Sequence, residues 1–138
     1  MKGRAILIFF ILFFFTPIII ASGFDATDIF SYDVVVPSRD KHAFYTGENV
    51  DPARSDFSVV SQLFLSNEKG NRLAVVSFKN LSSGTRTLSR NDIIAVLANG
   101  DKVFPGNVNF ELLGGDEKST AIDFGYQIFP ILYVYTRN

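Results

Sequence analysis

Hydrophobic residues follow two different patterns along this chain. Residues 5–22 form a long apolar run, preceded by Lys2 and Arg4 and broken by Thr16 and Pro17. Beyond this run, apolar residues come in short stretches separated by Gly, Asn, Asp and Ser. The first pattern predicts a hydrophobic leader, and the second predicts β-strands joined by turns.

The leader has the layout of a secretory signal peptide, because a basic start is followed by an apolar run and a small-residue exit, Ala-Ser-Gly, at 21–23. Pro17 favours a helix that ends near Thr16, as a signal peptide does before its cleavage site. We therefore predict a signal peptide at 1–23, cleaved after Gly23. Since 5–22 is long enough for a short membrane span, an uncleaved anchor is the alternative. In both cases the basic end stays inside and the remainder is exported to the periplasm or cell surface.

Eight apolar stretches in the remainder are predicted to be strands. They lie at 57–65, 72–78, 86–88, 93–97, 102–104, 108–113, 119–124 and 131–135. Strands at intervals of about 8–12 residues with turns between them are typical of all-β sandwiches and barrels. We predict an antiparallel, immunoglobulin-like β-sandwich of about seven to eight strands over 56–138. Residues 24–55 are predicted to be an extended arm with one short strand at 32–36.

Two local features add detail to this prediction. In the stretch 57–65, a period of two places Phe57, Val59, Leu63 and Leu65 on one face. Asn99-Gly100 predicts a two-residue type I′ turn, because this turn needs positive φ at both positions and Asn-Gly tolerates that best.

Composition limits the classes of protein that remain. Without residues 1–23 the chain has 115 residues, 11 basic and 14 acidic, and a net charge near −3. That size fits one domain, and an acidic domain without a basic stripe argues against nucleic-acid binding. Because the chain has no cysteine, its stability must come from burial rather than disulfides. The bulky candidates for the core are Phe57, Phe64, Phe78, Phe104, Phe110, Phe124 and Phe129.

The order of strands and turns from 73 to 124 resembles that of small exported bacterial domains of unknown function with a telokin-like, immunoglobulin-type sandwich. The shared pattern is a strand ending in Asn, a Leu-containing strand leading to Asp, a Gly-tipped hairpin, a Gly-Glu turn and a strand ending in Phe. Its counterparts here are 75–80, 88–92, 97–101, 114–117 and 122–125, about half of the mature chain. The resemblance implies a fold and an exported address, and it carries no catalytic residues.

Candidate chemistry is sparse. His42 is the single histidine, so a Ser-His-Asp triad would need it together with Asp40 or Asp51, and no serine lies in a nucleophile elbow. One histidine and no cysteine argue against zinc, and short acidic pairs such as Asp116 and Glu117 lack the spacing of a calcium loop. We therefore predict no catalytic residue, no metal site and no cofactor.

Aromatic residues near the end of the chain suggest a binding strip. The candidate residues for contact with a protein or cell-envelope partner are Tyr126, Phe129, Tyr133 and Tyr135. The alternative interpretation is that 131–135 simply alternates between core and rim. Direct membrane contact is expected only through 5–22, if the leader is uncleaved. The stretch Asn80-Leu81-Ser82 has the form of a glycosylation acceptor.

These features predict a non-enzymatic exported accessory or protein-interaction domain. A strand-exchanging fibre or pilus-type subunit is one alternative, because alternating apolar residues run from Gly125 to Tyr135 as in the terminal strand of such proteins. A small secreted hydrolase that uses His42 is the other.

Overall fold

The computed structural model of the chain describes residues 28–34 and 50–138. The leader, its predicted cleavage site and His42 lie outside the described residues. The described part consists of antiparallel β-strands and one short 3-10 helix, Arg90–Asp92. It includes no helix long and apolar enough to cross a membrane. The all-β prediction is therefore confirmed.

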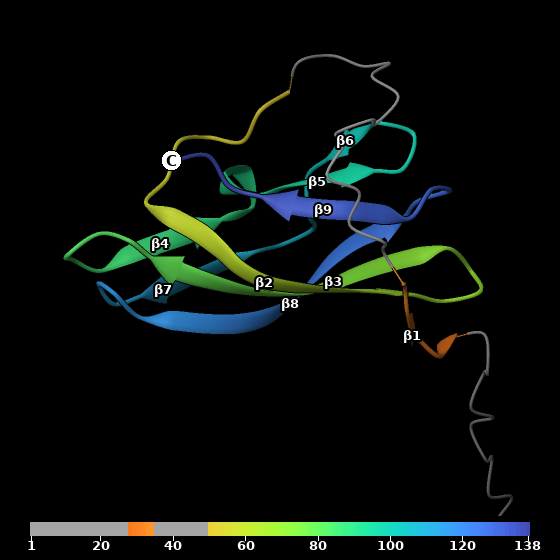
Figure 1. Cartoon of the computed structure of the whole chain (residues 1–138), viewed down its shortest axis with the longest axis horizontal. Helices are drawn as coiled ribbons and strands as arrows, with labels where there is room; N and C mark the ends of the chain where they lie inside the picture. The colour runs from red at the N-terminus through yellow and green to blue at the C-terminus, as the bar shows by residue number, and fades with distance from the viewer. Residues whose placement is uncertain (1–27, 35–49) are drawn as a thin grey trace, which may run out of the picture.

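Two layers of strands face each other (Figure 1). One layer is a four-stranded sheet in the order β1-β2-β3-β8, and the other contains a three-stranded sheet in the order β6-β5-β9. A separate pair, β4 and β7, completes the fold. The bounds are Ser31–Tyr32 (β1), Phe57–Ser66 (β2), Asn71–Asn80 (β3), Arg86–Ser89 (β4), Ile94–Leu97 (β5), Lys102–Val103 (β6), Asn109–Leu112 (β7), Glu117–Tyr126 (β8) and Ile131–Tyr135 (β9).

The core lies between the layers and draws on both. Its buried members are Phe57, Phe64, Ala74, Val76, Phe78, Leu88, Ile93, Ala95, Leu97, Leu112, Ile122, Phe124, Ile131 and Val134. Four of the predicted core phenylalanines are among them, and Phe110 packs against their edge. Phe129 is 41% exposed and is not a core residue. Full burial of each phenylalanine contributes about 1.5–3 kcal/mol, so these rings supply much of the driving force for folding.

The face predicted for β2 is wrong beyond its midpoint. Phe57 and Phe64 are buried, whereas Leu63 is 48% exposed. The cause is a β-bulge: Val59 pairs with Phe78 and Ser61 with Ser77, so Val60 is left as the extra residue. One inserted residue reverses the alternation of all side chains that follow it.

The predicted Asn99-Gly100 hairpin is confirmed, but its turn type is wrong. Gly100 has a φ of +91°, and no described residue other than glycine has positive φ. Leu97 accepts a hydrogen bond from the Gly100 nitrogen (2.9 Å) and donates one to the Asp101 carbonyl (2.9 Å). This is the three-residue loop in which glycine alone takes the left-handed conformation.

The described parts of the predicted arm are attached to both layers. Within the predicted strand 32–36, residues 35–36 lie outside the described part, and the observed strand is β1, paired with Leu65 and Ser66 of β2. Further along, Arg54 forms a parallel bridge to Arg137 beyond the end of β9. The arm therefore contributes the edge strand β1 to the four-stranded sheet and a single bridge beside the end of β9.

A buried asparagine organises the corner where β3 ends. The side chain of Asn80 is fully buried, and its Nδ2 donates to the carbonyls of Gly84 (2.8 Å), Leu112 (3.0 Å) and Leu113 (3.2 Å). Its Oδ1 accepts from the backbone nitrogen of Ser82 (2.9 Å). Because Nδ2 is the atom that a glycan would modify, the folded domain does not present Asn80 as an acceptor.

Two adjacent glycines at this corner give a matched test of its packing. A Cβ on Gly114 would lie 2.5 Å from the carbonyl oxygen of Ser83 and 2.8 Å from the nitrogen of Gly84, whereas Gly115 has open space but a φ of +81°. We expect Gly114→Ala to lower the free energy of unfolding by about 3 kcal/mol through backbone overlap. Gly115→Ala should cost about 1–2 kcal/mol through left-handed strain alone. Urea denaturation measures both free energies of unfolding. If the Gly114→Ala variant were as stable as the original chain, the close packing of Gly114 against Ser83 and Gly84 would be wrong.

Candidate binding surfaces

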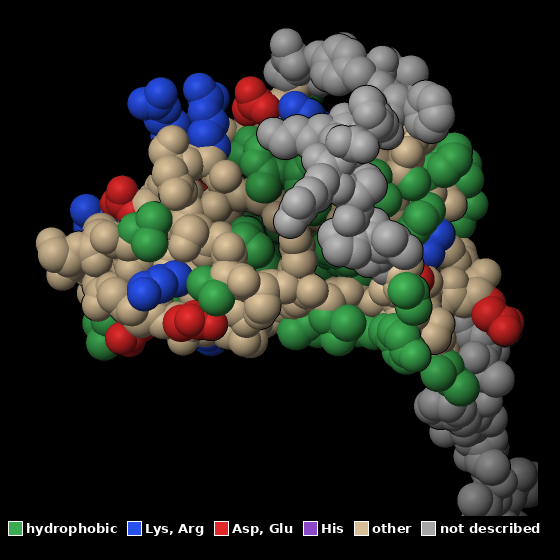
Figure 2. Space-filling model, viewed as in Figure 1, with side chains coloured by type: hydrophobic (Ala, Val, Ile, Leu, Met, Phe, Trp, Pro, Cys, Tyr) green, Lys and Arg blue, Asp and Glu red, His purple; other side chains and the backbone are tan. Residues whose placement is uncertain are grey.

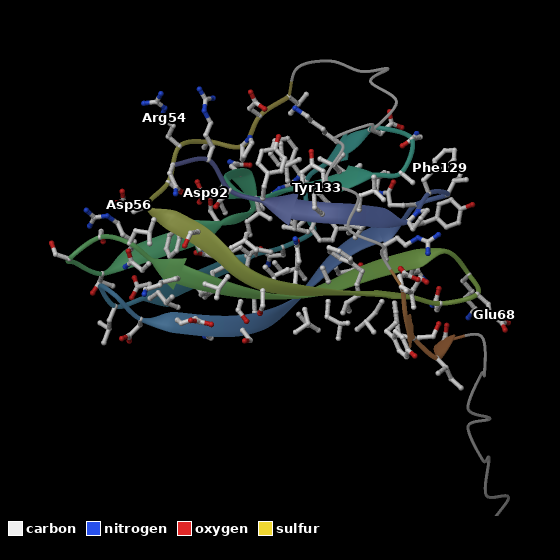
Figure 3. All side chains as sticks on the ribbon, viewed as in Figure 1. Arg54, Asp56, Glu68, Asp92, Phe129 and Tyr133 are labelled. Atoms are coloured by element: carbon white, nitrogen blue, oxygen red, sulfur yellow. The ribbon has the colours of Figure 1, made fainter. Side chains whose placement is uncertain are left out.

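The four aromatic residues predicted to form one strip lie in two separate places. Tyr133 and Tyr135 share one face of β9, with ring centroids 5.8 Å apart. Tyr126 ends β8, and Phe129 lies in the loop 127–130 that follows. Figure 3 shows Phe129 at the right-hand end of the domain and Tyr133 over the middle of β9. The structure therefore offers two candidate surfaces.

The first surface is the set Tyr126, Ile128 and Phe129, which we call the apolar tip. Their side chains are 65%, 72% and 41% exposed. Ile128 is the most exposed of the three, and sequence reasoning missed it. A single isoleucine in a short loop has no periodic pattern, so only its exposure in the fold reveals it.

The apolar tip is held by hydrogen bonds to its backbone. Arg72 of β3 donates from Nε to the carbonyl of Gln127 (3.2 Å) and from Nη2 to that of Ile128 (3.3 Å). The nitrogen of Gln127 donates to the carbonyl of Gly70 (2.9 Å) in the β2–β3 turn. A Cβ on Gly70 would lie only 2.8 Å from the ring of Tyr126, so this ring packs directly on the glycine. These contacts fix the loop while its apolar side chains face outward.

The second surface is the set Asp51, Lys102, Tyr133 and Tyr135, which we call the tyrosine face. Lys102 of β6 places its Nζ 3.1 Å from Asp51 Oδ1, and the Tyr135 hydroxyl donates to the same oxygen at 3.2 Å. The Lys102 ammonium also lies 5.9 Å from the centroid of the Tyr135 ring. Asp51 and Lys102 are far apart in sequence and were not paired by sequence reasoning.

The pairing of β9 with β5 in the same sheet explains the aromatic pattern of residues 131–135. Ile94 and Val96 of β5 lie opposite Tyr135 and Tyr133 and are buried. Val134, between the two tyrosines, points instead into the core between the layers. Val134 is thus a core residue, as expected if 131–135 alternates between core and rim. Tyr133 lies on the opposite face of β9 and is 39% exposed.

The charges of the tyrosine face stabilise one another. The hydrogen bonds from Lys102 and Tyr135 hold the pKa of Asp51 below its usual value of 3.8. Partial burial lowers the pKa of Lys102, but the bonds to Asp51 and Tyr135 outweigh it and raise the pKa above 10.5. Burial raises the pKa of Tyr135 above 10.0. Since a general base works best with a pKa near the working pH, these shifts suit an ion-paired anchor better than acid–base chemistry.

The other candidates for chemistry do not form a site in the described part of the chain. His42 and Asp40 lie outside it, and Asp51 is already bonded to Lys102 and Tyr135. Across residues 28–34 and 50–138, no group of three or more His, Cys, Asp or Glu side chains is placed to hold a metal ion.

No family model, curated protein or solved structure matches this chain. Its class is therefore defined by its own fold and surfaces, and that class is an all-β domain of two antiparallel layers with an apolar tip at one end.

The lowered pKa of Asp51 predicts a pH-dependent stability. A carboxylate with a depressed folded pKa stabilises the fold above its unfolded pKa, and this contribution is lost as pH falls through the folded value. We expect Asp51→Asn to lower Tm slightly at pH 7, and the difference from the original chain to shrink well below pH 3.8. Added salt should also reduce it, because the pair is partly exposed. A difference in Tm that is constant into strong acid would contradict the ion pair.

The hydrogen bonds from Arg72 predict the rigidity of the apolar tip. We expect Arg72→Met to speed hydrogen exchange at the Gln127 amide, which donates to the Gly70 carbonyl, by roughly tenfold, because two charge-assisted bonds to backbone carbonyls of this loop are lost. Arg86→Met is the matched control, since Arg86 pairs with exposed Asp56 at the opposite end of the domain. Unchanged exchange at the Gln127 amide would show that the loop is held by other contacts.

Proposed function

We propose that this chain is a non-enzymatic, exported interaction domain that presents the apolar tip to a partner in the periplasm or at the cell surface. The observation that carries the proposal is the combination of high exposure and fixed geometry at Tyr126, Ile128 and Phe129. Exposed apolar groups lower the solubility of a free protein, and they occur most often where another surface covers them. A rigid loop also loses little conformational entropy on binding.

The immunoglobulin-like arrangement within the all-β class is part of the same proposal. It is supported by β2, β3 and β8 in one antiparallel sheet facing β5, β6 and β9 in another. The resemblance to small exported bacterial domains is supported by the positions of its turn residues. Asn80 fills the corner at the end of β3, Gly100 closes a hairpin, and Gly115 takes a left-handed conformation in the turn before β8.

Export rests on the sequence of residues 1–23, which we propose is a signal peptide removed after Gly23. The absence of cysteine in the whole chain means that an oxidising compartment is not needed for stability. The apolar residues buried between the two layers stabilise the domain instead of disulfides.

The two alternative functions gain no specific support from the described residues. A strand-exchanging subunit would need a terminal strand free to leave, but Ile131 and Val134 of β9 are buried in their own core. The nitrogen of Val134 also donates to Gln62 Oε1 of β2 at 2.7 Å. A hydrolase would depend on His42, which lies outside the described residues, and on an aspartate such as Asp51 that is already in use.

A photo-crosslinking amino acid placed in living cells tests this proposal. At Phe129 it should form adducts with an envelope component, because the apolar tip meets a partner. At Leu113, which is 62% exposed at the opposite end, it should form few or none. Mass spectrometry of the exported chain should also find an N-terminus at Phe24. A cytoplasmic protein, or equal adducts at both positions, would refute the proposal.

A further inference from the structure

We infer that the partner of the apolar tip is a lipid bilayer, on which the domain docks with one end. This inference rests on the proposed export and names the surface that the exported domain contacts. It differs from anchoring by the leader, because here the folded domain itself inserts side chains into the membrane boundary.

Exposed large hydrophobic side chains are concentrated at this end of the domain. Figure 2 shows hydrophobic groups gathered at the right-hand end, where Figure 3 places Phe129 and Glu68, while Lys and Arg side chains gather at the left. Of the twelve exposed large hydrophobics in the described ranges 28–34 and 50–138, eight belong to β1 and its flanks, to β2 beyond its bulge, or to the apolar tip. They are Ile29, Phe30, Tyr32, Val34, Leu63, Tyr126, Ile128 and Phe129.

The register of the four-stranded sheet brings these groups to one end. Tyr32 of β1 pairs with Leu65 of β2, which pairs with Leu73 of β3, so a row of apolar side chains crosses three strands. One residue closer to the turn, Arg72 pairs with Gly125 of β8, immediately before the apolar tip. The β1 residues and the apolar tip therefore lie at the same end of one sheet and can meet one flat surface together.

The charges at this end favour insertion driven by apolar contact. In the described ranges 28–34, 63–73 and 123–130, the cationic side chains are Lys69 and Arg72. Lys69 pairs with Asp28 at 2.6 Å, and Arg72 is bonded to the carbonyls of the apolar tip. Asp33, Glu68 and Asp123 add further negative charges, so the two cations face four carboxylates in these ranges. Attraction to anionic lipids is therefore weak, and binding should need neither anionic lipid nor low salt.

The composition of the apolar tip suits the boundary between headgroups and acyl chains. Tyrosine is enriched at that depth, where its ring is buried and its hydroxyl stays hydrated. Tyr126 is 65% exposed and is adjacent to the aliphatic Ile128 and the ring of Phe129. Its apolar side chains could enter the boundary as those of interfacial amphipathic helices do, to a depth of about 5–10 Å.

The hydrophobic leader lies close to the same end in sequence. From Ser22, the end of the apolar run, to Asp28 is six residue steps, which span about 20 Å at most when extended. The ten-residue strands β2, β3 and β8 are each about 33 Å long. Until the leader is cleaved after Gly23, a bilayer that holds residues 5–22 is therefore within reach of Ile29 and Phe30, and the opposite end of the domain lies a strand length further away.

A tryptophan reporter tests the inference directly, because the chain has no tryptophan of its own. Ile128→Trp and Leu113→Trp variants of the exported chain, which starts at Phe24, are mixed with phosphatidylcholine vesicles with and without lipids brominated on their acyl chains. Both positions are highly exposed, at 72% and 62%, so both variants should fold, as circular dichroism will check. We expect bromine to quench roughly half or more of the emission at position 128 and little at position 113.

Equal quenching at both positions, or none at position 128, would overturn the inference. A second variant, Phe129→Trp, is the control for a local rearrangement that the substitution of Ile128 itself could cause. Its emission should be quenched in the same way. Emission changes that follow protein concentration rather than brominated lipid would assign the apolar tip to a second copy of the chain. If Phe129 crosslinks to a protein and bromine does not quench the emission, the proposal of an interaction domain is retained and the inference of a lipid partner is rejected.

Discussion

The apolar contact between the two layers is the constraint on which the rest of this structure depends. A chain without cysteine cannot offset the entropy of folding with cross-links, so stability has to come from buried surface. Phe57, Phe64 and Phe78 from one layer meet Ile131 and Val134 from the other. The core residues of the strands point toward this interface, and the side chains that remain exposed on the outside form the surface available for function.

Two irregularities make that contact possible, and both join the layers. The bulge at Val60 turns the second half of β2, so that Phe64 reaches the core and Gln62 accepts a hydrogen bond from Val134 of the opposite layer. At the other end of the domain, the buried side chain of Asn80 donates to the backbone carbonyls of Leu112 and Leu113 and so ties the end of β3 to the end of β7. When a buried polar group makes all its hydrogen bonds, they offset the cost of its desolvation and the group adds specificity.

The same layers position both candidate surfaces. The tyrosine face exists because β6 and β9 flank β5, which brings Lys102 beside Tyr135 and fastens the segment at Asp51 to the sheet. The apolar tip exists because Arg72 and Gly70 of the neighbouring strand and turn hold the loop after β8. One surface is closed by its own ion pair, whereas the other leaves apolar side chains uncovered, and this difference directs the functional proposal to the apolar tip.

The sequence by itself determined the strands and their turns, because alternation and turn residues act over a few neighbouring positions. The predicted stretch 131–135 coincides with β9, and the others agree with the observed strands to within a few residues. Only the tertiary structure decided which way Leu63 faces, how Gly100 closes its hairpin, and that Tyr133 and Phe129 belong to different surfaces. These outcomes depend on partners far away in the chain. Ser77 pairs with Ser61 after the bulge, the carbonyl of Pro130 accepts a hydrogen bond from Ala98 in the hairpin loop, and Arg72 donates to the backbone of the apolar tip. Local pattern does not encode such pairs, since they form only when two layers pack.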